Sequence, residues 1–469
     1  MRYGTQEVIY MKYTGHSVAD IKIAYVGGGS RGWAWKLMSD LASAEDISGS
    51  VDLYDIDYEA AEHNEIIGNR FNDLKDAKSK WTYRARKTLG EALTGADFVI
   101  ISILPATFDE MHSDVHTPEK YGIYQSVGDT AGPGGIIRAL RTIPMMEVIA
   151  EGIKNHCPNA WVINYTNPMA LCVKALYDTF PTIKAFGCCH EVFGVQELIA
   201  RTVEEKLGIK IADRSEIKTN VIGVNHFTWI TDAKYRNVDA GKIYGEYAKD
   251  HAVCGVPMKN PESMFEYKHR VKFDLYLRYG VIGAAGDRHL AEFCDGDWYL
   301  DSPEQVRDWG FHLTPVSWRK ENLKERLEKS RRLRLGEEEV KIENSGEEGV
   351  QQIRALLGLC DLVTNVNLPN VGQIPNLPLG AIVETNAAFR DNSITPVVAG
   401  NIPDGVWALV ARAVDEQLTV AKAAKERNLE LAFRAFSQNS LVRVDLPTAR
   451  ALFDEMVDNT KEYLQDYFK

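Results

Sequence analysis

A thiol, an imidazole and a carboxylate follow one another in the segment Cys189-His190-Glu191, which Cys188 separates from the short apolar run Ala185–Gly187. A second imidazole, that of His226, lies in the apolar, strand-like segment Asn220–Trp229. One thiolate and one neutral imidazole can hold a divalent metal and leave coordination positions open to a substrate. In the alternative interpretation, Cys189 is a small buried hydrophobic residue and His226 is a core histidine with ordinary hydrogen bonds.

The first expected strand of the chain leads into a glycine-rich turn. Ile21–Val26 is apolar and β-rich, and the pattern G-x-G-x-x-G follows it directly, before a helical pattern begins. The three glycines of this pattern are Gly27, Gly29 and Gly32. In dinucleotide-binding domains they allow a tight turn, close approach of the backbone to a pyrophosphate, and close packing of the helix. The next expected strand, Val51–Tyr54, ends at Asp55, which is placed to bind a ribose diol. The sequence therefore predicts that this segment binds a dinucleotide.

Two further segments place polar side chains where parallel strands would end. The expected strand Trp161–Tyr165 stops just before Asn167, whose amide could there bind a sugar or hydroxy-acid oxygen. The glycine-rich turn Gly128–Gly135 leads into a long helical pattern. This turn is either a plain loop or a substrate cradle in which Asp129 and Arg138 point inward.

The length of 469 residues exceeds that of one ordinary core and predicts two domains. We expect residues 1–20 to form an extension outside the fold. Residues 21–190 should form an α/β domain of Rossmann type that binds NAD. Residues 191–469, where strands and helices no longer alternate, should form an α+β domain for substrate, metal and oligomerisation. The charge-rich segment Arg319–Glu339 is expected to be a helix with a solvated face.

Charge and cysteine content limit the possible partners. The net charge of −12 argues against general nucleic-acid binding, which needs a basic surface. The seven cysteines are odd in number and do not resemble a disulfide framework, which favours a reducing compartment. No apolar run approaches the roughly 18–20 residues of a membrane span, and the first residues lack a signal-peptide core. We expect a cytoplasmic homo-oligomer, a dimer or tetramer, that acts on a small molecule.

Together these motifs resemble the NAD- and manganese-dependent glycoside hydrolases of family 4. The matching segments run in the family's order and are Val26–Ser30, Gly128–Gly135, Thr166–Pro168, Cys189–Val192, Asn225–Trp229 and Val366–Pro378. The form Cys-His-Glu-Val is similar to that of the branch acting on α-linked hexuronic acids, particularly galacturonides. The resemblance implies an architecture like that of lactate and malate dehydrogenases.

The resemblance also implies roles for particular residues. It makes Cys189 and His226 the ligands of Mn²⁺ or another divalent cation, and Asn167 the substrate-binding amide. The implied reaction is oxidation of the sugar at C3 by NAD⁺, removal of the C2 proton, elimination at C1, addition of water and return of the hydride. A uronate substrate needs a cation for its carboxylate, and Arg138 and Arg288 are the candidates.

The chain departs from the family at both proton-transfer positions. His190 stands where many members have aspartate or asparagine, so we expect His190 or a nearby group to be the general acid. The family's base is often a tyrosine, but the best-matching position holds none. We expect Asp287 to be the base, with Tyr279 as second choice. Alternatively, Asp287 forms only a surface ion pair with Arg288.

Three other functions stay open at this point. A dehydrogenase of the lactate or malate type would release NADH in net turnover and gives no reason for a metal-binding cysteine. A non-enzymatic dinucleotide sensor would leave Cys189, His226 and Asn167 without a task. The third is another specificity within family 4, such as an α-glucuronidase, α-galactosidase or 6-phospho-glucosidase.

Overall fold

The computed structural model describes residues 11–469, and six parallel strands form its centre. These strands are β2 Ser17–Val26, β3 Ile47–Tyr54, β4 Trp81–Arg86, β5 Phe98–Ile101, β6 Trp161–Asn164 and β7 Lys184–Gly187. Their order across the sheet is β4-β3-β2-β5-β6-β7, which is the order of a Rossmann-type dinucleotide-binding domain. The fold class predicted from the sequence is confirmed.

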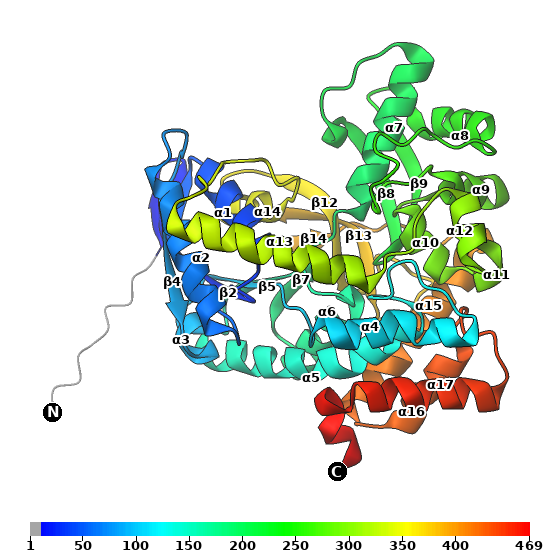
Figure 1. The fold of residues 1–469 in the computed structure, drawn as a ribbon. Coiled ribbons are helices and arrows are strands. Elements are labelled where there is room, and N and C mark those ends of the chain that lie inside the picture. Colours follow the sequence, from blue (N-terminus) through cyan, green and yellow to red (C-terminus); the bar gives the residue numbers. More distant parts are fainter. Residues whose placement is uncertain (1–10) are drawn as a thin grey trace.

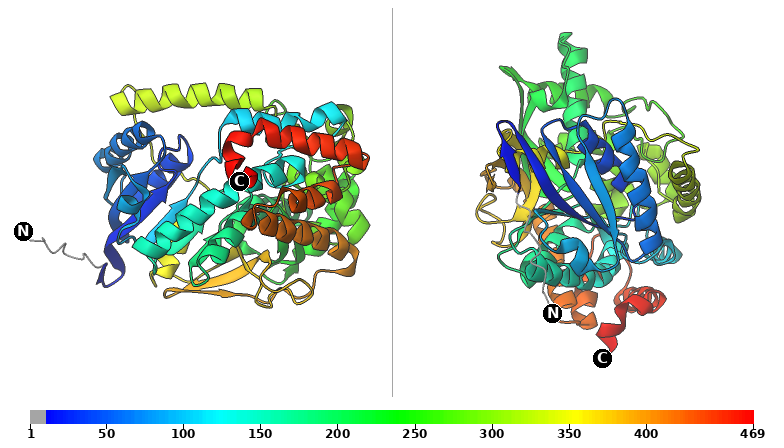
Figure 2. Two further views of the ribbon diagram at one scale, coloured as in Figure 1. Left: turned by 90° about the horizontal axis from the view of Figure 1, so that it is seen from below. Right: turned by 90° about the vertical axis from the view of Figure 1, so that its left-hand side faces the viewer.

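Helices alternate with these strands and cover both faces of the sheet (Figures 1 and 2). They are α1 Trp33–Ser43, α2 Tyr58–Arg70, α3 Leu89–Leu93, α4 Phe108–His116, α5 Gly132–His156 and α6 Met169–Thr179, with 3-10 turns at Phe71–Asp73 and Pro118–Tyr121. The apolar side chains of α1 and α2 join one hydrophobic core, and those of α5 and α6 join another. The strands are continuous apolar runs because the sheet is buried on both sides.

The chain enters this sheet earlier than the sequence predicted. Residues 1–10 lie outside the described part, but the strand β1 Lys12–Thr14 pairs in antiparallel fashion with the start of β2. A turn at Gly15, which has φ +63°, joins the two strands, and Val18 is buried. The expected extension over residues 1–20 is therefore wrong for residues 11–20, because this polar hairpin lengthens the strand that precedes the glycine-rich turn.

The same sheet also receives three strands from the second half of the chain. β12 Leu362–Pro369, β13 Ile382–Arg390 and β14 Ser393–Pro396 extend it in antiparallel fashion beyond β7. Asn367 of β12 is paired with Gly187 of β7. The predicted boundary at residue 190 therefore divides a continuous sheet, since late strands complete the layer that the first 190 residues begin.

A second, smaller sheet carries the other expected metal ligand. It consists of β8 Ile217–Val224, β9 Phe227–Tyr235, β10 Val238–Asp239 and β11 Ile282–Gly283. The segment 220–229, expected as one strand, is instead a hairpin of β8 and β9 whose two turn residues are Asn225 and His226. His226 adopts the left-handed conformation, with φ +63°, that such a tight turn requires.

Some of the remaining helices surround the second sheet, and the others pack elsewhere on the molecule (Figure 1). Those near the second sheet are α7 Glu191–Leu207, α8 Ala240–His251, α9 Arg270–Tyr279, α10 Asp287–Phe293, α11 Gly296–Tyr299 and α12 Pro303–Trp309, with a 3-10 turn at Arg214–Glu216. The others are α13 Val316–Leu335, α14 Gly349–Leu356, α15 Asp404–Lys425, α16 Leu429–Gln438 and α17 Leu446–Asn459, with a 3-10 turn at Lys461–Phe468. Over residues 11–469, every helix is too short or too polar to cross a bilayer.

Helix α13 bridges the two ends of the molecule (Figure 2, left). At its carboxyl end, Arg70 of α2 donates a hydrogen bond to the Arg334 carbonyl. Near its amino end, Lys320 forms an ion pair with Asp109 of α4. The charged side chains of α13 are all exposed or half-buried, as the charged sequence predicted.

Candidate active site

The predicted metal ligands lie on two neighbouring turns. Cys189 and His190 occupy the turn between β7 and α7, at the carboxyl end of the parallel sheet, where α/β folds bind ligands. His226 occupies the turn between β8 and β9. Both Cys189 and His226 are buried, with exposed fractions of 7% and 4%. A left-handed, non-glycine residue that is buried in this way is typical of a functional site.

His226 is held as a neutral imidazole. Its ring lies 3.9 Å from that of His289 between centroids. Burial, followed by the charge that His289 could carry, lowers the pKa of His226 to about 3. The Nδ1 atom of His226 is buried and has no hydrogen-bond partner within residues 11–469. A buried, unpartnered nitrogen lone pair on a neutral ring fits a metal ligand.

Cys189 has an apolar side and a polar side. It packs with Met169, Val173 and Ile382, as the core interpretation of this cysteine required. Burial, followed by the carboxylates of Glu384 and Glu191, raises the pKa of the Cys189 thiol. The thiol is therefore protonated unless a cation displaces the proton.

The donor set fits a divalent cation that is completed by substrate. In the described part of the chain, no three His, Cys, Asp or Glu side chains converge as a ready-made metal cluster. The two donors, Cys189 and His226, leave the remaining positions to oxygen atoms of a ligand.

Glu191 connects the two turns with a third segment. Its carboxylate accepts a hydrogen bond of 2.7 Å from the Gly286 amide and lies 3.5 Å from Nε2 of His289. Burial acts to raise the pKa of Glu191, but His289 and His226 outweigh it and lower the pKa to about 2. Glu191 is therefore an anion beside both imidazoles.

Tyr267 faces the same place. A Cβ atom built on Gly286 would lie 3.3 Å from the Tyr267 hydroxyl oxygen and 3.0 Å from the Glu191 carboxylate, so both groups flank this glycine. The ammonium of Lys272 lies 4.2 Å from the centre of the Tyr267 ring. Burial, followed by Glu191 and Asp287, raises the pKa of Tyr267. No sequence motif points to this tyrosine, because it lies outside the segment 276–289 in which the family resemblance places the base.

His190 lies in the turn between β7 and α7, near the start of α1. Its Nδ1 atom lies 3.2 Å from the Glu347 carboxylate, and its ring centre lies 6.2 Å from that of Trp33, the first residue of α1. The hydrogen bond with Glu347 raises the pKa of His190, although burial opposes it. His190 is thus a partly exposed imidazole that can hold a proton near the cofactor loop.

Arg138 lies beside Asn167 and within electrostatic reach of Asp129, an arrangement that a substrate cradle would need. The Arg138 Nε atom donates to the Asn167 carbonyl at 3.1 Å. Arg138 Nη1 and Asn167 Oδ1 are both buried without a hydrogen-bond partner in residues 11–469, so each has capacity for a ligand. Burial acts to raise the pKa of Asp129, but Arg138, His226 and His289 outweigh it and lower the pKa to about 2.

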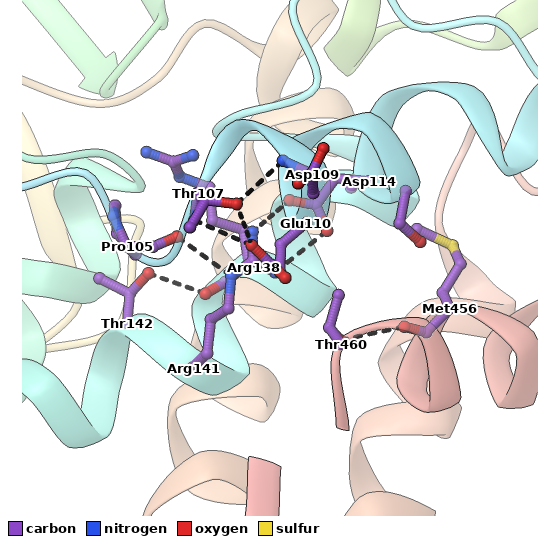
Figure 3. Close-up of polar contacts among 12 residues, drawn as sticks. Pro105, Thr107, Asp109, Glu110, Asp114, Arg138, Arg141, Thr142, Met456 and Thr460 are labelled. Atoms are coloured by element: carbon purple, nitrogen blue, oxygen red, sulfur yellow. Dashed lines mark hydrogen bonds and ion pairs between the residues drawn. The ribbon is translucent and has the colours of Figure 1, made fainter. Parts of the chain in front are cut away.

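A buried ion pair fixes the helix that carries Arg138. Arg141, one turn further along α5, pairs with Asp114 of α4 and donates to the Pro105 carbonyl at 3.2 Å (Figure 3). Both charged side chains are fully buried. This pair joins α4, α5 and the end of β5 below the site and limits the positions that Arg138 can take.

The position of Asp287 does not fit its expected role as a base. Its carboxylate is fully buried, lies 3.1 Å from the Lys272 ammonium and accepts hydrogen bonds from the Val271 and Lys272 amides. Asp287 therefore fixes the start of α9. The alternative, a surface ion pair with Arg288, is also wrong, because the partner is Lys272 and the pair is buried.

Arg288 and Tyr279 are occupied elsewhere. Arg288 donates to the carbonyl oxygens of His312 and Ser126 and to the Thr314 hydroxyl, so most of its guanidinium is committed. Tyr279 packs edge-on against Trp229, at a centroid distance of 6.3 Å. Burial, followed by Cys294, raises the pKa of Tyr279.

The glycine-rich turn is tight and leads directly into the start of α1. Gly27 has φ +93°, and a Cβ atom there would lie 2.1 Å from the Ser102 carbonyl oxygen. Gly32 precedes α1, whose first turn has neither an acidic residue nor a side-chain cap, so its amides are open to an anion. Asp55, at the end of β3, accepts a hydrogen bond of 2.9 Å from the Gly29 amide.

Two buried carboxyl groups support the site without having been predicted. Glu384 of β13 accepts hydrogen bonds from Asn365 at 2.7 Å and from Asn225 at 3.2 Å, which connects it with the β8–β9 turn. Glu292 of α10 accepts bonds from the amides of Val127 and Gly128, just before Asp129. Burial raises the pKa of each carboxyl group to about 7. Glu384 lies shortly after the late motif 366–378, which is the one signal that pointed toward it.

Solved structures resemble the whole chain. The crystal structure of the Bacillus subtilis protein lplD is 51% identical, covers 93% of this chain and 100% of its own, and superimposes with a TM-score of 0.90. A 6-phospho-alpha-glucosidase from gut microorganisms, solved with NAD and Mn²⁺, shares the fold at 20% identity, with a TM-score of 0.77 and coverage of 95% and 99%.

Sequence comparison identifies the family. An alpha-galacturonidase of Thermoanaerobacterium saccharolyticum is 61% identical over 97% of this chain and 99% of its own length, and one of Bacillus subtilis is 52% identical over 93% and 97%. Residues 22–205 match Family 4 glycosyl hydrolase, and residues 221–442 match the C-terminal domain of Family 4 glycosyl hydrolase. The chain therefore belongs to glycosyl hydrolase family 4.

Proposed function

We propose that this protein is an α-galacturonidase that requires NAD⁺ and a divalent cation. The observation that carries the proposal is the buried pair Cys189 and His226 beside the Asn167–Arg138 cradle, in a chain 52–61% identical to four alpha-galacturonidases. The pair has no use in a lactate- or malate-type dehydrogenase.

Different residues of the chain would bind NAD⁺ and the divalent cation. The turn Gly27–Gly32 and the open amides of α1 would hold the pyrophosphate of NAD⁺, and Asp55 would hold a ribose. Cys189 and His226 would hold the cation. When bound, NAD⁺ would take hydride from C3 of the sugar and the cation would polarise the neighbouring oxygen atoms.

We propose Tyr267 as the group that removes the C2 proton. Its hydroxyl flanks Gly286 together with Glu191, which contacts His289 and thereby adjoins the ring of His226. A tyrosine also agrees with the base that the family resemblance implies. Asp287, buried beside Lys272, would instead fix the backbone around Gly286.

His190 remains our proposed acid for the departing C1 oxygen. Its pairing with Glu347 favours the protonated imidazole, and its partial exposure allows proton exchange with solvent. Asn167 and Arg138 would orient the sugar, since each has an unpartnered polar atom in the cradle.

The test is a substrate panel with the full-length protein, NAD⁺, Mn²⁺ and a thiol reductant. The panel contains p-nitrophenyl α-galacturonide, α-galactoside and α-glucuronide, and a 6-phospho-glucoside. We expect turnover of the α-galacturonide, dependent on both cofactors, without net formation of NADH. Turnover of the 6-phospho sugar in preference would move the protein to another specificity, and stoichiometric NADH release would indicate a dehydrogenase.

A further inference from the structure

The amino end of α13 is fixed against the candidate site by several contacts. The Thr314 amide donates to the Ser126 carbonyl at 3.2 Å, and the Thr314 hydroxyl accepts from Arg288. The Trp318 ring packs edge-on against Phe265, two residues before Tyr267, at 5.4 Å. Arg319 follows Trp318 directly. The backbone that carries Arg319 is therefore anchored to Ser126, Arg288 and Phe265, which lie beside the site.

Arg319 differs from the other charged residues of α13. It is partly buried, and within residues 11–469 its guanidinium makes neither an ion pair nor a hydrogen bond. Burial lowers its pKa, and the Asp129 carboxylate acts in the opposite direction. The Asp129 carboxylate is therefore within electrostatic reach of Arg319 but does not pair with it.

The guanidinium groups of Arg138, Arg288 and Arg319 all act on the Asp129 carboxylate or are acted on by it. A uronate would bring one further negative charge to these three cations, which an uncharged sugar would not supply.

The three arginines are not equally available for that charge. Arg288 is committed to His312, Ser126 and Thr314, and Arg138 lies deep in the cradle, with its Nε atom bound to the Asn167 carbonyl. Arg319 has its whole guanidinium available, which is what two parallel hydrogen bonds to a carboxylate require. It also retains exposure to solvent, from which an anionic substrate enters.

We propose that Arg319 binds the C6 carboxylate of the uronic acid and is the residue by which this enzyme selects uronides over neutral sugars. The inference rests on the proposed function. It gives the charge-rich helix α13 a direct part in substrate recognition, in addition to its role as a bridge between the two ends of the molecule.

The test compares an anionic substrate with an uncharged substrate of nearly the same shape. We would measure kcat/KM of the NAD⁺- and Mn²⁺-loaded enzyme for p-nitrophenyl α-galacturonide and for its methyl ester. Arg319→Gln should lower kcat/KM for the acid by about 10²-fold, because a charge-assisted bidentate contact is lost. It should leave the value for the ester nearly unchanged. Arg319→Lys should lie between the two enzymes, since it keeps the charge and loses the fork.

A matched control separates this effect from general electrostatics. Lys324→Gln removes one positive charge from the solvent side of the same helix, where Lys324 pairs with Glu321, and should leave the acid-to-ester ratio unchanged. Circular dichroism and the NAD⁺ Kd should show that all variants fold.

An equal loss of kcat/KM for acid and ester in Arg319→Gln would overturn the inference. The absence of any loss for the acid would overturn it as well. If Arg138→Gln alone lowered the ratio of kcat/KM for the acid to kcat/KM for the ester, the carboxylate would be assigned to Arg138. If the unmodified enzyme hydrolyses no galacturonide, the proposed function fails, and the inference fails with it.

Discussion

The imidazole rings of His226 and His289 lie 3.9 Å apart between their centroids and are tilted by 37° to each other. One ring comes from the β8–β9 turn and the other from α10. Burial lowers the pKa of both rings, so both are neutral at pH 7. The arrangement places a predicted ligand, His226, against a histidine that the sequence analysis did not single out.

This pair predicts how the protein binds a cation. His226→Ala should lower the affinity for Mn²⁺ by more than about 100-fold, because it removes a ligand, and His289→Ala by about 10-fold, because it removes a neighbour that orients the ligand. Isothermal titration of Mn²⁺ into the NAD⁺-free protein measures both values independently of activity. His251→Ala on α8, where His251 stacks on Tyr247, is the control. Unchanged affinity in His226→Ala would exclude His226 as a ligand.

The Asp287–Lys272 pair predicts a loss of stability when one charge is removed. Asp287→Asn leaves the Lys272 ammonium buried without its counter-charge, which should lower the free energy of unfolding by about 3–5 kcal/mol. The double variant Asp287→Asn/Lys272→Met should recover part of that loss, because no uncompensated charge remains. Urea unfolding followed by circular dichroism measures the effect. If Asp287→Asn is fully stable but inactive, Asp287 is a catalytic group after all.

Glu292 predicts a pH dependence of stability. Burial raises its pKa to about 7 despite the hydrogen bonds from Val127 and Gly128, whereas the ordinary value is 4.5. Between these two values the folded protein holds a proton that the unfolded chain has lost. This contribution to stability is therefore present below pH 4.5 and is lost as the pH rises toward 7, by up to about 3 kcal/mol.

In Glu292→Gln the side chain cannot ionise in either the folded or the unfolded state. The free energy of unfolding of the variant, relative to the unmodified protein, should therefore be higher at pH 8 than at pH 5. Guanidinium unfolding at the two pH values gives the comparison. The same relative stability at both values would show that Glu292 is already ionised at pH 5 in the folded protein.

The sequence predicted those parts of the site that local patterns determine. The strand, glycine-rich turn and helix from β2 to α1 form a continuous segment, so their hydrophobic pattern and glycine spacing were sufficient. Cys189 and Asn167 follow strands of a parallel sheet, and the carboxyl ends of such strands meet at one edge. The sequence was therefore sufficient to predict that Cys189 and Asn167 lie at the same edge of the sheet.

Groups whose position depends on tertiary packing could not be assigned in this way. Asp287 follows a glycine in the segment expected to hold the base, but its burial beside Lys272 is a property of the packed α9–α10 pair. Arg319 belongs to a charged helix whose sequence predicts solvent exposure, and it is half-buried because the amino end of α13 packs against Phe265 and Ser126. The addition of β12–β14 to the first sheet has no local signal, since these strands pair across a long sequence separation.

The bond that Tyr267 would break is the C2–H bond of the sugar. Glycosidases that act through two carboxylates leave the C2–H bond intact, since both groups act only at C1 and at the leaving oxygen. If NAD⁺ oxidises C3 first, the C2 hydrogen becomes acidic and is lost to a base, and solvent later replaces it. Hydrolysis in D₂O should therefore give a uronic acid with deuterium at C2 and its original hydrogen at C3, as read by proton NMR of the product.

Tyr267 and Tyr279 provide a matched pair for assigning that step. Tyr267→Phe should lower kcat for the α-galacturonide by about 10²–10⁴-fold, the usual range for loss of a general base, and NAD⁺ binding should be unaffected because Tyr267 lies apart from the Gly27–Gly32 turn. Tyr279→Phe should act like the unmodified enzyme, because its ring packs against Trp229, away from His226. Exchange at C2 should slow together with turnover in Tyr267→Phe alone. Product that keeps its C2 proton in D₂O would exclude the oxidation and elimination route, whereas normal exchange in Tyr267→Phe would retain the route and require a different base beside Gly286.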